Sequence, residues 1–241
     1  MRTIAIYNPK GGVGKTSLAA NLAWCAVTLS QRKTLLWDLD VQGGAGYVLG
    51  LDMDPSVRHK NLFEGKSEIQ HAPVPTHIPN LDVIMADPSL SALDRTLFQL
   101  GKKKRMARMV QVLHQNYDRV FIDCPAGHGA LADQILRAAD IVLLPVIPSP
   151  LSQRVVQFSL SWFAANAEKP IMLLPIFSMA DRKKPLHRDA MAAFPDWPVI
   201  PASNLIERMG EKRTALGQFA PNSAAQSAIT ALWRGIERKL Q

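Results

Sequence analysis

The chain has 241 residues, of which 28 are lysine or arginine and 20 are aspartate or glutamate, so its formal net charge is +8. An apolar share of 47% excludes a disordered or fibrous chain, and two cysteines are too few for a disulfide framework. No apolar run approaches the roughly 18–20 residues that a membrane span needs. We therefore expect one globular, basic domain over residues 1–241, located in the cytoplasm.

Strand-like and helix-like segments alternate along the chain. Short apolar runs predict buried strands at residues 3–7, 34–37, 81–85, 120–122, 141–146, 171–177 and 199–200. Helices are expected over residues 17–29, 102–114, 131–139, 151–165 and 224–240. The proline-rich stretch of about 50–80 is expected to be irregular. Because this alternation implies right-handed crossovers, we expect an α/β fold with a mostly parallel twisted sheet and helices on both faces.

The charge is distributed unevenly. Residues 38–94 carry three basic and nine acidic side chains, whereas residues 95–117 carry six basic and no acidic ones. Residues 181–241 carry ten basic and six acidic side chains. A basic excess favours a polyanionic partner such as nucleic acid or an anionic membrane surface. The run from Lys102 to Arg108 is equally compatible with an ordinary solvated helix face.

The strongest local signal is the segment PKGGVGKTS at residues 9–17, between the first predicted strand and the first predicted helix. Glycines let backbone N–H groups turn towards phosphate oxygens, and the following helix N-terminus adds about half a positive charge. In such a P-loop, Lys15 reaches the β- and γ-phosphates and the Thr16 hydroxyl binds Mg²⁺. The residues expected to hold phosphate are Lys10, Gly11, Gly12, Val13, Gly14, Lys15, Thr16 and Ser17.

This loop resembles the deviant Walker A motif, KGGxGK[ST], of the ParA/MinD family of ATPases, because a second lysine, Lys10, precedes the glycines. Pro9 stands where many members have Gln or Gly. Residues 35–44, LLWDLDVQGG, look like the first switch of the family, with Gly44 in place of Asn. Residues 117–127, YDRVFIDCPAG, look like its Walker B strand and second switch. The resemblance covers nearly the whole chain and implies a P-loop NTPase fold of the deviant Walker A type.

Asp38 and Asp40 stand two residues apart at the end of a predicted strand, so they point to the same face. The resemblance implies that Asp40 orients the attacking water, and that Asp38 and Asp123 join Thr16 around Mg²⁺. It also implies that Lys10 contacts phosphates in the partner subunit of an ATP-bound homodimer. The catalytic residues implied in this way are Lys10, Lys15 and Asp40, and the implied cofactors are ATP and Mg²⁺.

The segments at 171–182 and 199–201 are similar to the last two nucleotide-binding strands of the family, with Ser178 where Thr is usual. Members contact adenine from the loops that follow these strands. The corresponding residues here are Ser178, Met179, Pro201, Ala202 and Ser203. None of these residue types compels adenine over guanine, so ATP is implied by the resemblance alone.

The resemblance to ParA-type proteins implies an ATPase that partitions or positions DNA or another cargo. Its ATP-bound dimer would bind double-stranded DNA of the nucleoid without sequence preference, and a ParB-like or cargo-adaptor protein would stimulate hydrolysis and release. The candidate DNA-binding residues are Arg182, Lys183, Lys184, Arg188, Arg208, Lys212 and Arg213. Since the chain begins at the first strand, we expect no N-terminal DNA-reading extension and no operator-specific repression.

Two alternatives compete with DNA partitioning. A MinD-like protein would bind membranes through a terminal amphipathic helix, and Ile229, Leu232, Trp233, Ile236 and Leu240 form an apolar stripe. A closing helix of this family usually packs on the sheet, which makes membrane binding the weaker hypothesis. A metallocluster enzyme needs cluster thiolates, and neither Cys25 nor Cys124 is placed for that role. The cargo itself cannot be identified from the sequence.

Overall fold

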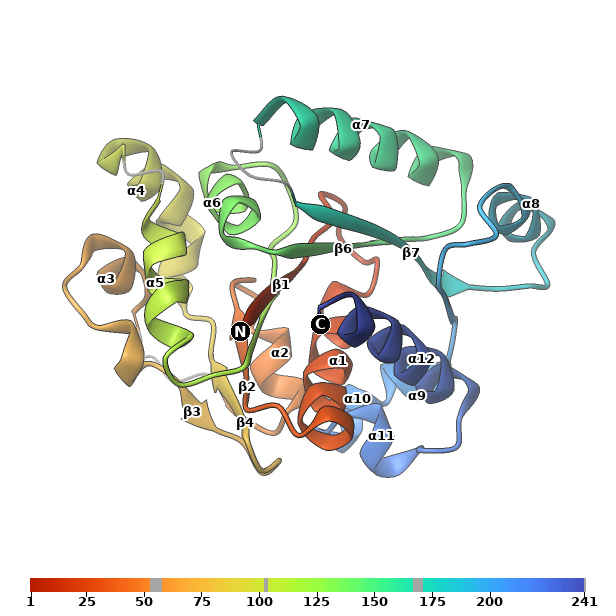
Figure 1. Cartoon of the computed structure of the whole chain (residues 1–241), viewed down its shortest axis with the longest axis horizontal. Coiled ribbons are helices and arrows are strands. Elements are labelled where there is room, and N and C mark those ends of the chain that lie inside the picture. Colours follow the sequence, from red (N-terminus) through yellow and green to blue (C-terminus); the bar gives the residue numbers. More distant parts are fainter. Residues whose placement is uncertain (53–57, 102–103, 167–170, 241) are drawn as a thin grey trace.

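The computed structural model describes residues 1–52, 58–101, 104–166 and 171–240. Its centre is an eight-stranded sheet in the order β3-β4-β2-β5-β1-β6-β7-β8 (Figure 1). All neighbouring strands run parallel except β3 and β4. The strands are β1 (Arg2–Ile6), β2 (Thr34–Asp38), β3 (Val74–Pro75), β4 (Leu81–Ile84), β5 (Arg119–Asp123), β6 (Ile141–Val146), β7 (Met172–Ala180) and β8 (Val199–Pro201).

Helices cover both faces of the sheet (Figure 1). The first group packs on one face and consists of α1 (Lys15–Ser30), α2 (Gly44–Val48), α9 (Asn204–Glu207), α10 (Met209–Lys212), α11 (Leu216–Phe219) and α12 (Ala224–Lys239). The second group packs on the other face and consists of α3 (His59–Glu64), α4 (Leu93–Leu100), α5 (Arg105–Leu113), α6 (Ala130–Ala138), α7 (Pro150–Asn166) and α8 (Pro185–Ala193). Two short 3₁₀ helices, η1 (Ile69–His71) and η2 (Pro88–Ala92), lie between strands.

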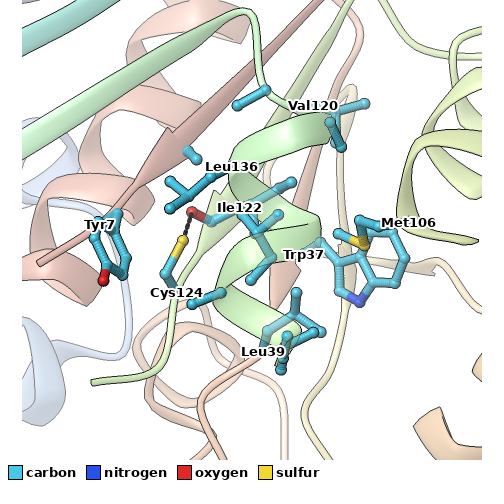
Figure 2. Packing of buried hydrophobic residues seen from close by; sticks show 14 of the residues in the cluster. Tyr7, Trp37, Leu39, Met106, Val120, Ile122, Cys124 and Leu136 are labelled. Carbon is cyan, nitrogen blue, oxygen red and sulfur yellow. Dashed lines mark hydrogen bonds between the residues drawn. The ribbon is translucent and has the colours of Figure 1, made fainter. Parts of the chain in front are cut away.

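The central strands are apolar on both sides because each side meets a helical layer. Along β1, Ile4 and Ile6 face the layer of α1 and α12, whereas Ala5 and the following Tyr7 face the layer of α5 and α6. Figure 2 shows part of this second layer, where Trp37, Ile122 and Met106 pack together. The predicted α/β fold with a mostly parallel sheet and helices on both faces is therefore confirmed.

The predicted strands and helices are confirmed with small shifts of their ends, but the stretch of about 50–80 was wrongly expected to be irregular. It contains α3, η1 and β3, although residues 53–57 lie outside the described part of the chain. Pro75 is tolerated in β3 because this strand lies at the edge of the sheet, where one side needs no ladder hydrogen bonds. The predicted helix from residue 102 begins at Arg105, with Lys104 at its N-cap, whereas Lys102 and Lys103 lie outside the described residues.

The apolar stripe of α12 belongs to the core. Ile229, Trp233 and Ile236 are at most 1% exposed and pack with α1 and the sheet, and Leu240 packs against the same cluster. A stripe buried in this way is not available to a membrane surface. Within the described part of the chain, no helix is both long and apolar enough to cross a bilayer.

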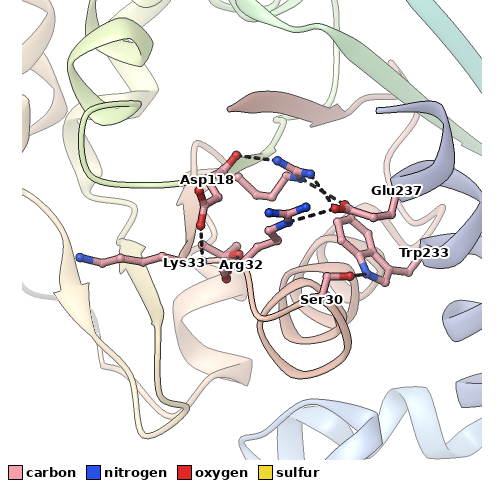
Figure 3. A network of polar contacts seen from close by, with 8 residues as sticks. Ser30, Arg32, Lys33, Asp118, Trp233 and Glu237 are labelled. Atoms are coloured by element: carbon pink, nitrogen blue, oxygen red, sulfur yellow. Dashed lines mark hydrogen bonds and ion pairs between the residues drawn. The ribbon is translucent and has the colours of Figure 1, made fainter. Parts of the chain in front are cut away.

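An ionic network attaches α12 to the amino ends of the central strands, on the side of the sheet away from the P-loop (Figure 3). Glu237 accepts hydrogen bonds from Arg119 at 2.7 Å and from Arg32 at 3.1 Å. Arg119 is only 5% exposed, so its guanidinium depends on this carboxylate for compensation of its charge.

We predict that Glu237→Gln lowers the free energy of unfolding by roughly 3 kcal/mol, because the substitution leaves the Arg119 charge buried without a counter-charge. Urea denaturation followed by circular dichroism measures the change. Glu211→Gln is the matched control: Glu211 pairs with Arg208 at 3.0 Å on the surface, where such a pair contributes little. Equal unfolding midpoints for Glu237→Gln and the control would contradict the structural role of this network.

Candidate active site

The P-loop connects the end of β1 to the start of α1. Gly12 and Gly14 have φ angles of 71° and 84°, values that favour glycine. Gly14 also lies against β7, since a Cβ atom there would stand 3.1 Å from the Ser178 hydroxyl. These two positions therefore need glycine, and the loop brings backbone N–H groups to the N-terminus of α1, where an anion is favoured.

Asn8 fixes the entrance of the loop, and its role was missed in the sequence. The side chain is buried; its amide donates to the Pro145 carbonyl at 2.7 Å, and its oxygen accepts from the Lys10 amide at 2.8 Å. The loop is thereby attached to β6. A polar residue at the end of an apolar strand was the available signal.

The two lysines of the loop have different environments. Lys15 is 7% exposed, and its ammonium donates to the Lys10 carbonyl at 3.1 Å, so its charge lies within the loop. Lys10 is exposed. A buried cation inside the loop suits a phosphate of the protein's own nucleotide, whereas an exposed cation is free to reach another molecule.

Asp38 and Asp123 are paired neighbours at the ends of β2 and β5, and both are fully buried. Asp38 accepts hydrogen bonds from the backbone N–H groups of Asp40 and Ala45 at 3.1 and 2.9 Å. Burial raises the pKa of Asp38 to about 6, because the charge of Asp40 adds to the effect while the backbone hydrogen bonds only partly oppose it.

Asp123 is the unsatisfied group of the site. Neither of its two buried carboxylate oxygens has a hydrogen bond of good geometry to the described residues, although the Thr16 hydroxyl is a weak donor beside them. Burial and the neighbouring Asp38 raise its pKa well above the ordinary value, while Thr16 and Lys15 act in the opposite direction. A buried carboxylate without a partner costs free energy unless a cation or an ordered water compensates it, so Asp123 suits a cation site.

The donor set around Asp123 fits Mg²⁺ bound mainly through non-protein oxygens. In the described part of the chain, no group of three or more His, Cys, Asp or Glu side chains is arranged to hold a metal. Mg²⁺ is typically held by one or two carboxylates together with waters and substrate phosphates. Gly44 leaves room beside Thr16, since a Cβ atom there would lie 3.1 Å from the threonine methyl group.

Asp40, the predicted water-orienting residue, is partly exposed at the start of the first switch. Its carboxylate accepts from the Gln42 amide at 3.1 Å and so stabilises its own turn. The side chain thus lies on the same loop as predicted and close to Asp38, but its catalytic role stays a prediction.

A cavity of about 240 Å³ opens beside the P-loop, between the start of α1 and the ends of β7 and β8. All five residues predicted for adenine line it, together with Gly12, Gly14 and Ser17. The structure therefore brings the two predicted groups to one cavity. Sequence reasoning missed Asn21, Ile206 and Glu207, which also line it.

Ser178 and Met179 were wrongly placed in a loop after the strand. Both belong to β7, which extends to Ala180 through an irregular pairing with β8 between Phe177 and Ala180. Met179 has a φ angle of 54°, which is unusual for a non-glycine residue and turns the strand at this point. Likewise, Pro201 is the last residue of β8. The end of β7 could not be predicted because its irregular pairing with β8 does not require particular residue types.

The predicted DNA-binding residues form two groups after β7 and β8. Arg182, Lys183, Lys184 and Arg188 are exposed, and none of them forms an ion pair with the described residues. In the second group, Arg208 and Lys212 both pair with Glu211, and Arg213 pairs with Asp52 at 2.8 Å. The first group is therefore the stronger free positive surface.

Residues 1–163 match the model of a protein family described as an AAA domain. This match covers more than half of the chain, so the protein belongs to that class of P-loop ATPases. Within this class, the chain is a member of the ParA/MinD family.

The chromosome partitioning protein ParA of Myxococcus xanthus is 38% identical over 148 residues, which are 60% of this chain and 52% of the relative. The virulence plasmid ParA family protein pGP5-D of Chlamydia psittaci is 26% identical over 100% of this chain and 96% of its own length. Cobyrinic acid a,c-diamide synthase of Mycobacterium smegmatis, solved with an ATP analogue and magnesium, is 26% identical with a TM-score of 0.82, covering 100% of this chain and 96% of the other. The chain matches about half the length of the curated chromosome-partitioning relatives.

We predict that Asp123→Asn stabilises the nucleotide-free protein by about 1 kcal/mol or more at pH 8, because it removes an uncompensated buried charge. The Asp123 carboxyl binds its proton more tightly in the folded wild-type protein than in the unfolded chain. Wild-type stability therefore falls as pH rises from the pKa of this group in the unfolded chain to its higher pKa in the folded protein. The advantage of the variant should accordingly disappear near pH 4, as measured by urea denaturation at several pH values.

Asp87→Asn is a control of opposite sign for this experiment. Burial acts to raise the pKa of Asp87, but hydrogen bonds from His59 and Ser89 outweigh it and hold the pKa below its ordinary value. This substitution should destabilise the protein at pH 8, and the loss should shrink in acid. If Asp123→Asn instead behaves like Asp87→Asn, the Asp123 carboxylate is not the uncompensated charge described above.

Proposed function

We propose that this protein is an ATP-hydrolysing switch that partitions or positions plasmid DNA, chromosomal DNA or another cargo. One observation carries the proposal: the P-loop, the buried Lys15 and the unpartnered Asp123 meet beside a cavity lined by all five predicted base-contacting residues. The partitioning role is supported by the chromosome partitioning protein ParA of Myxococcus, and a plasmid cargo by the virulence plasmid ParA family protein of Chlamydia. ATP and magnesium are supported by the Mycobacterium synthase structure, which contains an ATP analogue and magnesium.

Each residue has a defined part in this proposal. Lys15 and the loop N–H groups bind the phosphates, and Thr16, Asp123 and Asp38 hold Mg²⁺, which supplies neutralisation of phosphate charge. Asp40 turns from its own loop to orient the attacking water. Phosphoryl transfer needs positioning and charge stabilisation more than covalent chemistry, and these groups are what one subunit contributes to both.

Lys10 completes the site in trans. Its exposed side chain is free to reach the phosphates of a second copy, so ATP would join two subunits into a homodimer. Cations supplied in trans are worth roughly 10³–10⁵ in rate in other phosphoryl-transfer enzymes. We further propose that a ParB-like or cargo-adaptor protein stimulates hydrolysis, and that the dimer resides on nucleoid DNA in the cytoplasm.

The two lysines should give different phenotypes. We predict that Lys15→Ala abolishes ATP binding, whereas Lys10→Ala retains it but loses ATP-dependent dimerisation and turnover. Equilibrium dialysis with ATP and size-exclusion chromatography separate the two effects, and Asp40→Ala should give a dimer that does not hydrolyse ATP. Lys33→Ala, an exposed lysine at the opposite edge of the sheet, is the control. ATP-dependent dimers of Lys10→Ala would refute the role in trans.

The two groups of basic residues, after β7 and after β8, should contribute unequally to DNA binding. We predict that substituting alanine for Arg182, Lys183 and Lys184 weakens ATP-dependent binding of random duplex DNA and lowers the salt slope by about 0.9 per lost phosphate contact. Alanine at Arg208 and Lys212 should have a smaller effect, because both are already paired with Glu211. Filter binding at several salt concentrations with ATP, ADP and no nucleotide tests this. Equal wild-type binding in all three nucleotide states would refute the switch.

A further inference from the structure

The loop that follows Asp123 is attached to the segment that enters the P-loop at Cys124, Gly127 and His128. The Cys124 amide donates to the Ile6 carbonyl at 3.3 Å. The Gly127 amide donates to the Pro9 carbonyl at 2.9 Å. The Tyr7 hydroxyl donates to the Gly127 carbonyl at 3.2 Å and lies 2.7 Å from the His128 ring nitrogen Nδ1. Among the described residues, no other hydrogen bond reaches residues 125–128.

The Tyr7 ring is a rigid support for this loop. It is 2% exposed and belongs to the buried cluster, where Figure 2 shows it beside Cys124. His128 is exposed, but its ring packs edge-on against two aromatic rings. The ring centroids lie 6.1 Å apart for Tyr7 and 5.2 Å apart for Phe158 of α7. His128 thus lies between a side chain fixed in the core and a surface helix.

This support contributes to the position of Asp123, because neither oxygen of its carboxylate has a hydrogen bond of good geometry to the described residues. On one side its backbone is fixed by the β5 ladder, and on the other side by residues 124–129. Gly127, with a φ angle of 100°, adds no side chain to restrict that loop. The chain that leaves Asp123 is held first at Cys124, whose amide donates to the Ile6 carbonyl at 3.3 Å. Beyond Cys124, the Tyr7 hydroxyl and the Pro9 carbonyl are its anchors.

A buried tyrosine hydroxyl usually finds some partner, so a hydrogen bond alone would indicate no more than ordinary satisfaction of a polar group. The choice of partner is what matters here. Tyr7 directly precedes Asn8, which holds the P-loop, and its hydroxyl bonds to the second switch. One residue therefore connects the two segments that must be aligned for hydrolysis.

We propose that Tyr7, assisted by His128, is a positioning residue for ATP hydrolysis that holds the second switch, and through it Asp123, in register with the P-loop. This inference rests on the proposed ATPase function. Neither side chain lines the base cavity, so nucleotide affinity should not depend on them. Small displacements of reacting groups can cost up to about 10²-fold in rate, which makes kcat the sensitive quantity.

The test compares Tyr7→Phe and His128→Ala with Tyr117→Phe in the full chain. Tyr117 is also a buried tyrosine, and its hydroxyl donates to Asp82 at 2.7 Å away from the P-loop, so its variant controls for the loss of a buried hydroxyl. We expect kcat for ATP to fall roughly tenfold in Tyr7→Phe and several-fold in His128→Ala, with KM unchanged. Hydrogen–deuterium exchange of the nucleotide-free protein should become faster in residues 124–130 in Tyr7→Phe but not in Tyr117→Phe.

The outcomes separate the two proposals. An active wild-type protein whose Tyr7→Phe variant matches Tyr117→Phe in kcat, or shows unchanged exchange in residues 124–130, refutes the positioning role alone. If Tyr7→Phe instead raises KM with kcat unchanged, Tyr7 contributes to nucleotide binding, and the positioning role is refuted as well. A wild-type protein without ATP turnover refutes the proposed function, and this inference with it. Because His128 is exposed, His128→Ala preserves the core and remains informative if Tyr7→Phe folds poorly.

Discussion

The site depends on one electrostatic constraint, the burial of two carboxylates side by side at the ends of β2 and β5. Asp38 meets this constraint with backbone hydrogen bonds from its own loop, whereas Asp123 has none from the described residues. Like charges in a poorly solvated place raise each other's pKa and favour any nearby cation. The Lys15 ammonium in the adjacent loop and the proposed Mg²⁺ are the compensating charges. Without ligand, the folded protein therefore retains an uncompensated negative charge, which favours the binding of a cation together with phosphate.

The sequence was sufficient for the parts of the structure that depend on local chemistry. Apolar runs predicted the central strands because both faces of a parallel sheet are covered, and Gly12, Gly14 and Lys15 identified the P-loop because no other residues meet its demands. The sequence was not sufficient where strand register or a tertiary contact determines the conformation of a residue. Met179 occupies β7 through an irregular pairing with β8, and Pro75 occupies an edge strand despite its missing N–H group. The contacts of Asn8 with Pro145 and of Tyr7 with Gly127 were overlooked because these partners lie more than a hundred residues away.

The carboxyl ends of the parallel strands concentrate these features at one edge of the sheet. β1 leads into the P-loop, β2 into the first switch, β5 into the second switch, and β7 and β8 into the base cavity. Ligands bind at this edge in open α/β sheets because the loops there converge while the strands stay fixed. The opposite edge carries the Arg119–Glu237 network, which attaches α12 and contributes stability rather than chemistry.

The placement of the basic groups follows from the same geometry. Arg182, Lys183 and Lys184 lie one residue beyond β7, and Ser178 and Met179 near the end of that strand line the base cavity. The proposed DNA surface and the proposed nucleotide site are therefore successive segments of one strand and its loop. A change of nucleotide that shifts the end of β7 would move these cations without a long relay through the protein. The net charge alone indicates only a polyanionic partner, whereas the position of these exposed cations explains how DNA affinity could follow the nucleotide state.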